Sequence, residues 1–289
     1  MLTFASVKGL NMKKLKFVLL AAATLAFVVA CGQKKAPKVL VLYYSQTGTT
    51  KAVAEELQTR LGADIEEILP VQAYDGSYQE TISRGMQEMN GGKMPELQPL
   101  KVDVSAYDVI FLGFPVWFGT YANPIGTLLD EVDFSGKKVV PFCTFGSGGL
   151  DASVAAIKAK IPNAEVLPGY GVRAARIKAV PDELDRFLKA GGFIAGEPVK
   201  LEDFSASHPV SEEESAIFDT AVGDYPMIRA KATEVASRAI PGGTEYLFRA
   251  ADLPREGAPG MPAPPAAAGF QVYVTALDGQ APEFTQVVR

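Results

Sequence analysis

Apolar runs of strand length alternate with amphipathic stretches through the first two thirds of the chain. Residues 38–44 form a nearly continuous apolar run, which is typical of a parallel strand buried on both faces. A polar loop follows, and then residues 51–61, where Val53, Leu57 and Leu61 recur at helical spacing. The pattern therefore predicts a strand, a loop and a helix in that order.

The same alternation continues along the chain. It predicts further strands at 64–69, 109–114, 138–145 and 165–172, accompanied by helices near 79–90, 125–132, 151–160 and 181–189. Strands that alternate with helices indicate an open parallel sheet with right-handed crossovers and helices on both faces. The predicted fold class is α/β, a doubly wound five-stranded parallel sheet whose ligands bind beyond the carboxyl ends of the strands.

A second, smaller domain is predicted after a polar stretch that follows residue 196. It contains a helix around 212–222 and apolar-polar alternation at 244–250, 270–277 and 284–288, while residues 227–237 fit a helix or a strand. These patterns predict one helix and several strands, and a resemblance described below implies that they form an α+β domain with an antiparallel sheet. The expected division is 38–195 for the first domain, 196–210 for a linker and 211–289 for the second domain, with a Pro-, Gly- and Ala-rich loop at 256–269.

The N-terminus has the pattern of an export signal. Three lysines at 13, 14 and 16 precede an uncharged apolar stretch of about 14 residues, shorter than the roughly 20 needed to cross a membrane. Residues 1–30 therefore predict a signal peptide. The sequence Val28-Val29-Ala30-Cys31-Gly32 resembles the lipobox of bacterial lipoproteins, and simple secretion is the alternative.

The lipobox resemblance implies that Cys31 is lipidated and becomes the mature N-terminus, with residues 31–37 as a tether. Several acyl chains on one residue give stable membrane association. The expected location is the bacterial cell envelope, outside the cytoplasm.

Charge and cysteine content narrow the possible functions. From Cys31 onward there are 24 basic and 33 acidic residues, a formal charge of −9, which disfavours nucleic-acid binding. Cys143 lies in an apolar run and is expected to be a buried structural thiol, because no other cysteine remains to pair with it. The sequence shows no cluster of histidine, cysteine and carboxylate residues for a metal site and no catalytic triad.

Residues 45–50 are candidates for binding phosphate. They supply four hydroxyls, backbone amides and Gly48 just before the first predicted helix, whose N-terminal dipole favours an anion. The same hydroxyls could instead cap the helix.

The motif Ser-x-Thr-Gly-x-Thr directly after the first strand resembles the phosphate loop of flavodoxins. Two further loops match in order, at 113–121 after the third strand and at 144–149 after the fourth, where flavodoxins contact the isoalloxazine ring. The resemblance is closest to short-chain flavodoxins and implies FMN as cofactor and the strand order 2-1-3-4-5. The implied cofactor-binding residues are Ser45, Gln46, Thr47, Gly48, Thr49, Thr50, Pro115, Val116, Trp117, Phe118, Gly119, Tyr121, Thr144, Phe145, Gly146, Ser147, Gly148 and Gly149.

The residue types in the second and third loops suit a flat ring. Trp117, Phe118 and Tyr121 offer aromatic faces for stacking, and the alternative is that they pack in the core. Gly146 and Gly148 allow backbone to approach the flavin edge, or simply turn the chain.

A shorter resemblance marks the second domain. The sequence Ala239-Ile240-Pro241-Gly242-Gly243-Thr244-Glu245-Tyr246 resembles the turn and following strand of cystatin-like domains, but it lacks the first two residue types of their inhibitory motif. The resemblance therefore implies a fold and not protease inhibition.

Three functions are compatible with these features. The leading hypothesis is an exported, lipid-anchored protein that binds FMN and transfers electrons to an unknown redox partner. An FMN-dependent reductase that passes electrons from a nicotinamide donor to quinones is the first alternative. A cell-surface binding protein that uses the fold as a scaffold is the second.

Overall fold

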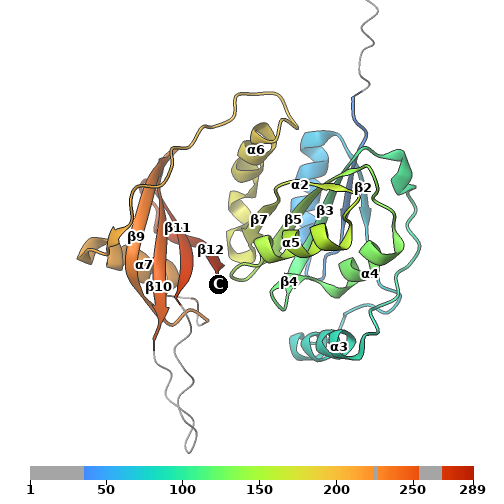
Figure 1. The fold of residues 1–289 in the computed structure, drawn as a ribbon, viewed down its shortest axis with the longest axis horizontal. Helices are drawn as coiled ribbons and strands as arrows, with labels where there is room; N and C mark the ends of the chain where they lie inside the picture. The colour runs from blue at the N-terminus through green and yellow to red at the C-terminus, as the bar shows by residue number, and fades with distance from the viewer. Residues whose placement is uncertain (1–35, 224, 226, 254–268) are drawn as a thin grey trace, which may run out of the picture. The chain divides into compact units, whose positions relative to one another are not determined.

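Figure 1 shows the computed structural model of the chain, which describes residues 36–223, 225, 227–253 and 269–289. The predicted signal peptide, the predicted lipidation site Cys31 and nearly all of the predicted 256–269 loop lie outside these residues. Residues Lys38–Arg289 form one unit that carries two sheets. In the described part of the chain, no helix is long and apolar enough to cross a membrane.

The first sheet is parallel apart from one short hairpin strand. Its order is β2-β1-β3-β5-β6, with β4 paired to β3 and β7 paired to β5. The strands are β1 (Val39–Tyr43), β2 (Asp64–Glu67), β3 (Val109–Trp117), β4 (Thr120–Tyr121), β5 (Lys138–Phe145), β6 (Glu165–Val166) and β7 (Tyr170–Arg173). With β5 as the fourth parallel strand and β6 and β7 as the fifth, the predicted order 2-1-3-4-5 is confirmed.

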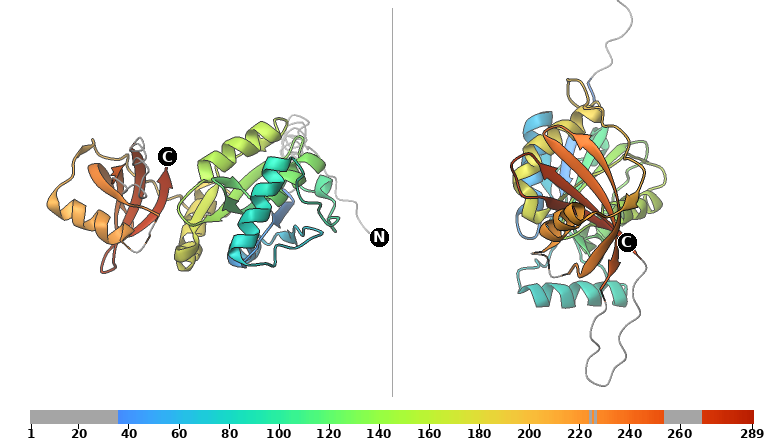
Figure 2. Two further views of the ribbon diagram at one scale, coloured as in Figure 1. Left: turned by 90° about the horizontal axis from the view of Figure 1, so that it is seen from below. Right: turned by 90° about the vertical axis from the view of Figure 1, so that its left-hand side faces the viewer.

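Helices cover both faces of this sheet (Figures 1 and 2). They are α2 (Thr49–Leu61), α4 (Asn123–Glu131), α5 (Leu150–Lys160) and α6 (Val180–Ala190). Helix α3 (Tyr78–Gly91) lies apart from the strands and contacts α4, and there are short 3₁₀ turns η1 (Val104–Ala106) and η2 (Ala174–Ala179). Val41 of β1 is buried with α2 and α6 on one face, whereas Leu40 and Leu42 are buried with α4 and α5 on the other. This period of two explains why β1 is apolar at nearly every position.

The predicted strands at 165–172 and 109–114 differ most from the structure. The single strand predicted at 165–172 is wrong: β6 and β7 are separate, because Pro168 has no amide to donate to β5. The third strand continues beyond Phe114 to Trp117, because its end pairs with β4 in a hairpin.

The second sheet is antiparallel, with the order β12-β11-β10-β9-β8. Its elements are β8 (His208–Pro209), α7 (Glu212–Val222), β9 (Ala230–Ile240), β10 (Gly243–Asp252), β11 (Phe270–Leu277) and β12 (Glu283–Val288). Phe218 of α7 is fully buried against Phe248 of β10, with ring centroids 5.3 Å apart. The predicted antiparallel sheet with one helix is confirmed, and the ambiguous stretch 227–237 is mostly strand.

Candidate functional site

The loop between β1 and α2 has the geometry of an anion site. Gly48 is the N-cap of α2 in the left-handed region, at φ 86°. Within the described residues, the amides of residues 46–50 donate to no acceptor, while the Lys51 amide donates to Ser45 Oγ at 3.2 Å. Thr47 and Gly48 are exposed. Several free amides therefore lie at a helix N-terminus, where an anion is favoured.

Thr50 has a different role from the other hydroxyl residues of this loop. It is buried, and its Oγ1 lies 2.8 Å from Thr144 Oγ1 at the end of β5. These two residues are 94 positions apart in the chain, and their hydrogen bond holds the first and third predicted loops together at the carboxyl edge of the sheet.

The second predicted loop is a tight hairpin. Val116 pairs with Tyr121 and Trp117 pairs with Thr120, so Phe118 and Gly119 form a two-residue turn. Their φ angles are 51° and 87°, as a type I′ turn requires. Phe118 thus adopts a backbone conformation that is uncommon for an aromatic residue, and its side chain is exposed at the tip of the hairpin. The Thr120 hydroxyl oxygen is buried and has no hydrogen-bond partner among the described residues.

Trp117 is half-buried and packs edge-to-face with two tyrosines. Its ring centroid lies 4.9 Å from that of Tyr74 and 5.8 Å from that of Tyr44. Tyr121 packs against Phe114 in the same way, at 6.2 Å. The aromatics of this hairpin therefore divide between the core and the surface, and Phe118 is the exposed one of the three.

Several residues that the sequence did not single out as functional support this hairpin. Tyr74 donates a hydrogen bond to Glu88, and Arg84 donates to Glu88 at 2.8 Å and lies over the Tyr74 ring at 3.8 Å. Asn123 donates to Glu88 at 2.8 Å. The spacing of Arg84 and Glu88, four residues apart on a predicted helix, is the one sequence signal that could have indicated this network.

Burial keeps the tyrosine hydroxyls of this aromatic cluster protonated. Burial, together with the hydrogen bond to Glu88, raises the pKa of the Tyr74 hydroxyl, and burial likewise raises that of Tyr44. Both tyrosines are therefore neutral hydrogen-bonding groups at physiological pH. Burial also raises the pKa of the Cys143 thiol, which is free, so the prediction of a buried structural thiol is confirmed.

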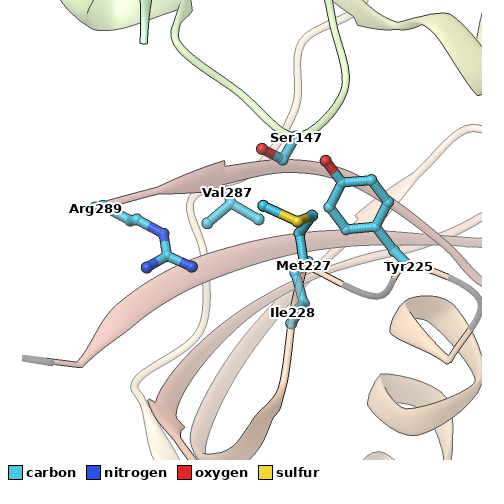
Figure 3. A pocket seen from close by; sticks show the side chains of 6 residues that line it. All are labelled: Ser147, Tyr225, Met227, Ile228, Val287 and Arg289. Atoms are coloured by element: carbon cyan, nitrogen blue, oxygen red, sulfur yellow. The ribbon is translucent and has the colours of Figure 1, made fainter. Parts of the chain in front are cut away.

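The third predicted loop, 144–149, meets the second sheet. The carbonyl of Gly146 accepts a hydrogen bond from Arg173 Nε at 2.9 Å, and the carbonyl of Ser147 accepts one from the Val287 amide at 2.6 Å. Figure 3 shows Ser147 close to Tyr225 and Val287, two of the residues that line a cavity here. Gly149, at φ 112°, is the N-cap of α5 and lies against Val116 of the hairpin.

The structure thus brings the three predicted loops to one edge of the sheet. The first and third are joined through Thr50 and Thr144, and the second and third through Val116 and Gly149. A protein-family model described as flavodoxin matches residues 38–185, just over half of the chain. The chain belongs to the flavodoxin family.

Individual flavodoxins and flavoproteins are similar to parts of this flavodoxin-family chain. Flavodoxin 1 of Escherichia coli K12 is 26% identical over 106 residues, which cover 35% of this chain and 46% of that protein. The chain thus spans about half the length of the curated relatives it matches. A flavoprotein from Lactobacillus acidophilus NCFM, solved in complex with FMN, is 28% identical at a TM-score of 0.46, over 53% of this chain and all of that one.

The apo form of that Lactobacillus flavoprotein, solved by NMR, is 29% identical at a TM-score of 0.40, over 47% of this chain and 93% of that one. Membership of the flavodoxin family confirms the prediction of FMN as cofactor. Which residues of the flavodoxin domain contact it stays a prediction.

Proposed function

We propose that this chain is an electron-transfer flavoprotein that holds FMN at residues 45–50, 115–121 and 144–149. The observation that carries the proposal is the set of free amides at residues 46–50, placed at the N-terminus of α2 and at the carboxyl edge of a flavodoxin-family sheet. This is the edge at which open α/β sheets bind their ligands.

The residues of the first loop fit a phosphate group. The free amides offer donors, the hydroxyls of Thr47 and Thr49 lie 3.3 Å apart on the exposed side of the loop, and no acidic residue occupies the first turn of α2. At Gly48, a Cβ atom would have nothing within 4 Å, so the backbone is open at the point where a ligand would approach. A dianion there gains charge-assisted hydrogen bonds and a favourable helix dipole.

The second loop supplies aromatic side chains that fit a flat ring. FMN, when bound, supplies the electron-transfer chemistry of its ring system. Trp117 and its tyrosine neighbours give a rigid aromatic wall, because Tyr74 is fixed by Glu88 and Arg84. The ring of Phe118, at the tip of the hairpin, lies against Gly85 of α3. The buried Thr120 hydroxyl, which has no hydrogen-bond partner among the described residues, lies on the residue paired with Trp117 across the hairpin.

FMN titration of the chain beginning at Gly32 tests the proposal. We expect a stable complex whose visible spectrum and flavin fluorescence differ from those of free FMN, because the ring would be removed from water. The complex should also accept electrons from a chemical reductant. A chain that is folded by circular dichroism but leaves FMN free would contradict both flavin-based functions and favour a scaffold role. Rapid oxidation of a nicotinamide donor with a quinone would favour the reductase instead.

We further propose that the mature protein is anchored to the cell envelope by lipid on Cys31. The lysines before the apolar stretch and the cysteine after its small residues support this proposal. In bacterial fractionation, the unaltered chain is expected in the membrane pellet. Cys31→Ser is expected either in the soluble exported fraction or as an uncleaved precursor. A Cys143→Ser variant is the matched control, because that thiol is buried in the core and should leave the distribution unchanged. An unaltered chain in the soluble fraction would overturn the anchor.

A further inference from the structure

The free edge of the second sheet lies against the 144–149 loop. β12 is the last strand of that sheet, so its outward amides have no partner strand among the described residues. One of them, on Val287, donates to the Ser147 carbonyl at 2.6 Å. The Val287 carbonyl approaches so closely that a Cβ atom on Gly148 would lie 2.3 Å from it. Gly148 therefore has a structural requirement that involves β12.

Arg173 joins the same two segments from the end of β7. Its Nε donates to the Gly146 carbonyl at 2.9 Å, and its Nη1 donates to the Phe284 carbonyl of β12 at 3.0 Å. Its guanidinium carbon lies 3.4 Å from the centroid of the Phe284 ring. A planar guanidinium can stack and donate in two directions at once, which the ammonium of a lysine cannot.

A second arginine anchors the start of β12. Arg176 is buried and pairs with Glu283 at 3.0 Å and with Glu183 of α6 at 2.8 Å. Both ends of β12 are therefore attached to the first domain. Two consecutive carbonyls of the 144–149 loop are therefore connected to β12. The Gly146 carbonyl accepts from Arg173, which stacks on Phe284 of β12, and the Ser147 carbonyl accepts from the Val287 amide of β12.

We propose that Arg173, Phe284 and Val287 form a latch through which the second domain positions the 144–149 loop for FMN. The inference rests on the proposed function, because this loop is one of the three assigned to the cofactor. A loop with glycines at 146, 148 and 149 has large conformational freedom, and ordering it on binding would weaken affinity. Because the latch orders the loop before FMN binds, binding does not require the loop to lose that conformational entropy. Arg173 and Val287 are positioning residues and need not touch the cofactor.

Val287→Pro removes one hydrogen bond of the latch and keeps an apolar side chain at this buried position of the second domain. Proline lacks the amide that reaches Ser147, and it is tolerated where a strand amide points away from its own sheet. Arg173→Gln removes the second connection. Each variant, made in the full chain, is expected to weaken FMN binding by about three- to tenfold and to shift the reduction potential of the bound flavin.

Arg238→Gln is the matched control. Arg238 pairs with Glu245 at 2.6 Å and lies over Phe204 at 4.4 Å, so this variant loses a charge-assisted hydrogen bond and an aromatic contact, as Arg173→Gln does, but in the second domain and its linker. Its FMN affinity and potential should equal those of the unaltered chain. Unchanged affinity in both latch variants, or an equal loss in Arg238→Gln, would overturn the latch.

Hydrogen exchange of residues 144–149 in the flavin-free chain separates this inference from the proposed function. Faster exchange in Val287→Pro and Arg173→Gln than in Arg238→Gln is expected, because the loop loses its connection to β12. If the unaltered chain binds no FMN, the proposed function fails together with the role of the latch in affinity. Faster exchange would then still support the ordering of the loop by β12, and equal exchange would reject that as well.

Discussion

Gly113→Ala is expected to destabilise the first domain by about 3 kcal/mol, at the upper end of the cost of overpacking a core. A Cβ atom at this position of β3 would lie 2.1 Å from the ring of Phe142 on the adjacent strand β5, and Phe142 is fully buried. Denaturant unfolding followed by tryptophan fluorescence measures the effect, because Trp117 is the only tryptophan.

A second-site change checks the cause of this loss. With Phe142→Leu in the same chain, Gly113→Ala should cost nothing further, because the ring that it meets is gone. Gly126→Ala in α4 is the control: its Cβ atom would have an ordinary 3.6 Å contact with Tyr121, and alanine favours a helix by about 0.5 kcal/mol. A Gly113→Ala chain as stable as the unaltered one would show that β3 and β5 can separate at this point.

Gly48→Ala is expected to weaken FMN binding by at least about tenfold. At φ 86° alanine is strained, so the loop must change the direction of its amides or present a Cβ atom where a ligand would approach. One lost hydrogen bond to a charged group is worth about 1.5–3 kcal/mol, which corresponds to tenfold or more in the dissociation constant. Fluorescence titration with FMN measures the change.

The control for this variant lies at the other end of the same helix. Gly62→Ala also places alanine at a positive φ, 59°, with nothing within 4 Å of its Cβ atom, but about 20 Å from the loop. Both variants should lose similar stability, of about 1 kcal/mol, while FMN affinity falls in Gly48→Ala alone. Riboflavin, which has no phosphate, should bind equally to both. Equal FMN affinity in the two variants would show that the phosphate does not bind at this loop.

Hydrophobic periodicity was sufficient to predict most of the first sheet, but it left β9 of the second sheet undecided between helix and strand. The run at 38–44 and the helical repeat at 51–61 correspond to β1 and α2 within one residue or two. These signals are local, because the period of side-chain burial follows directly from the geometry of a strand or a helix. The wrong prediction of one strand at 165–172 also has a local cause. This apolar run contains Pro168, whose nitrogen cannot donate a hydrogen bond within a parallel sheet.

The candidate site was only partly predictable from the sequence. The three loops follow β1, β3 and β5, and parallel strands place their carboxyl ends at one edge, so their convergence could be expected. The roles of individual residues could not. Thr50 resembles the other hydroxyl residues of its loop, yet its side chain is used to bind Thr144.

The amino-acid sequence by itself determined where strands and helices form, the order of the parallel sheet through its family resemblance, and which loops carry phosphate-binding and aromatic residues. The tertiary structure decided which side chains meet: Trp117 with Tyr74, Arg84 with the same ring, and Val287 with Ser147. The first kind of information depends on neighbours a few positions apart, whose spacing is visible in the chain. The second depends on contacts between distant segments, and these arise only when burial of both apolar faces has fixed the sheets in place.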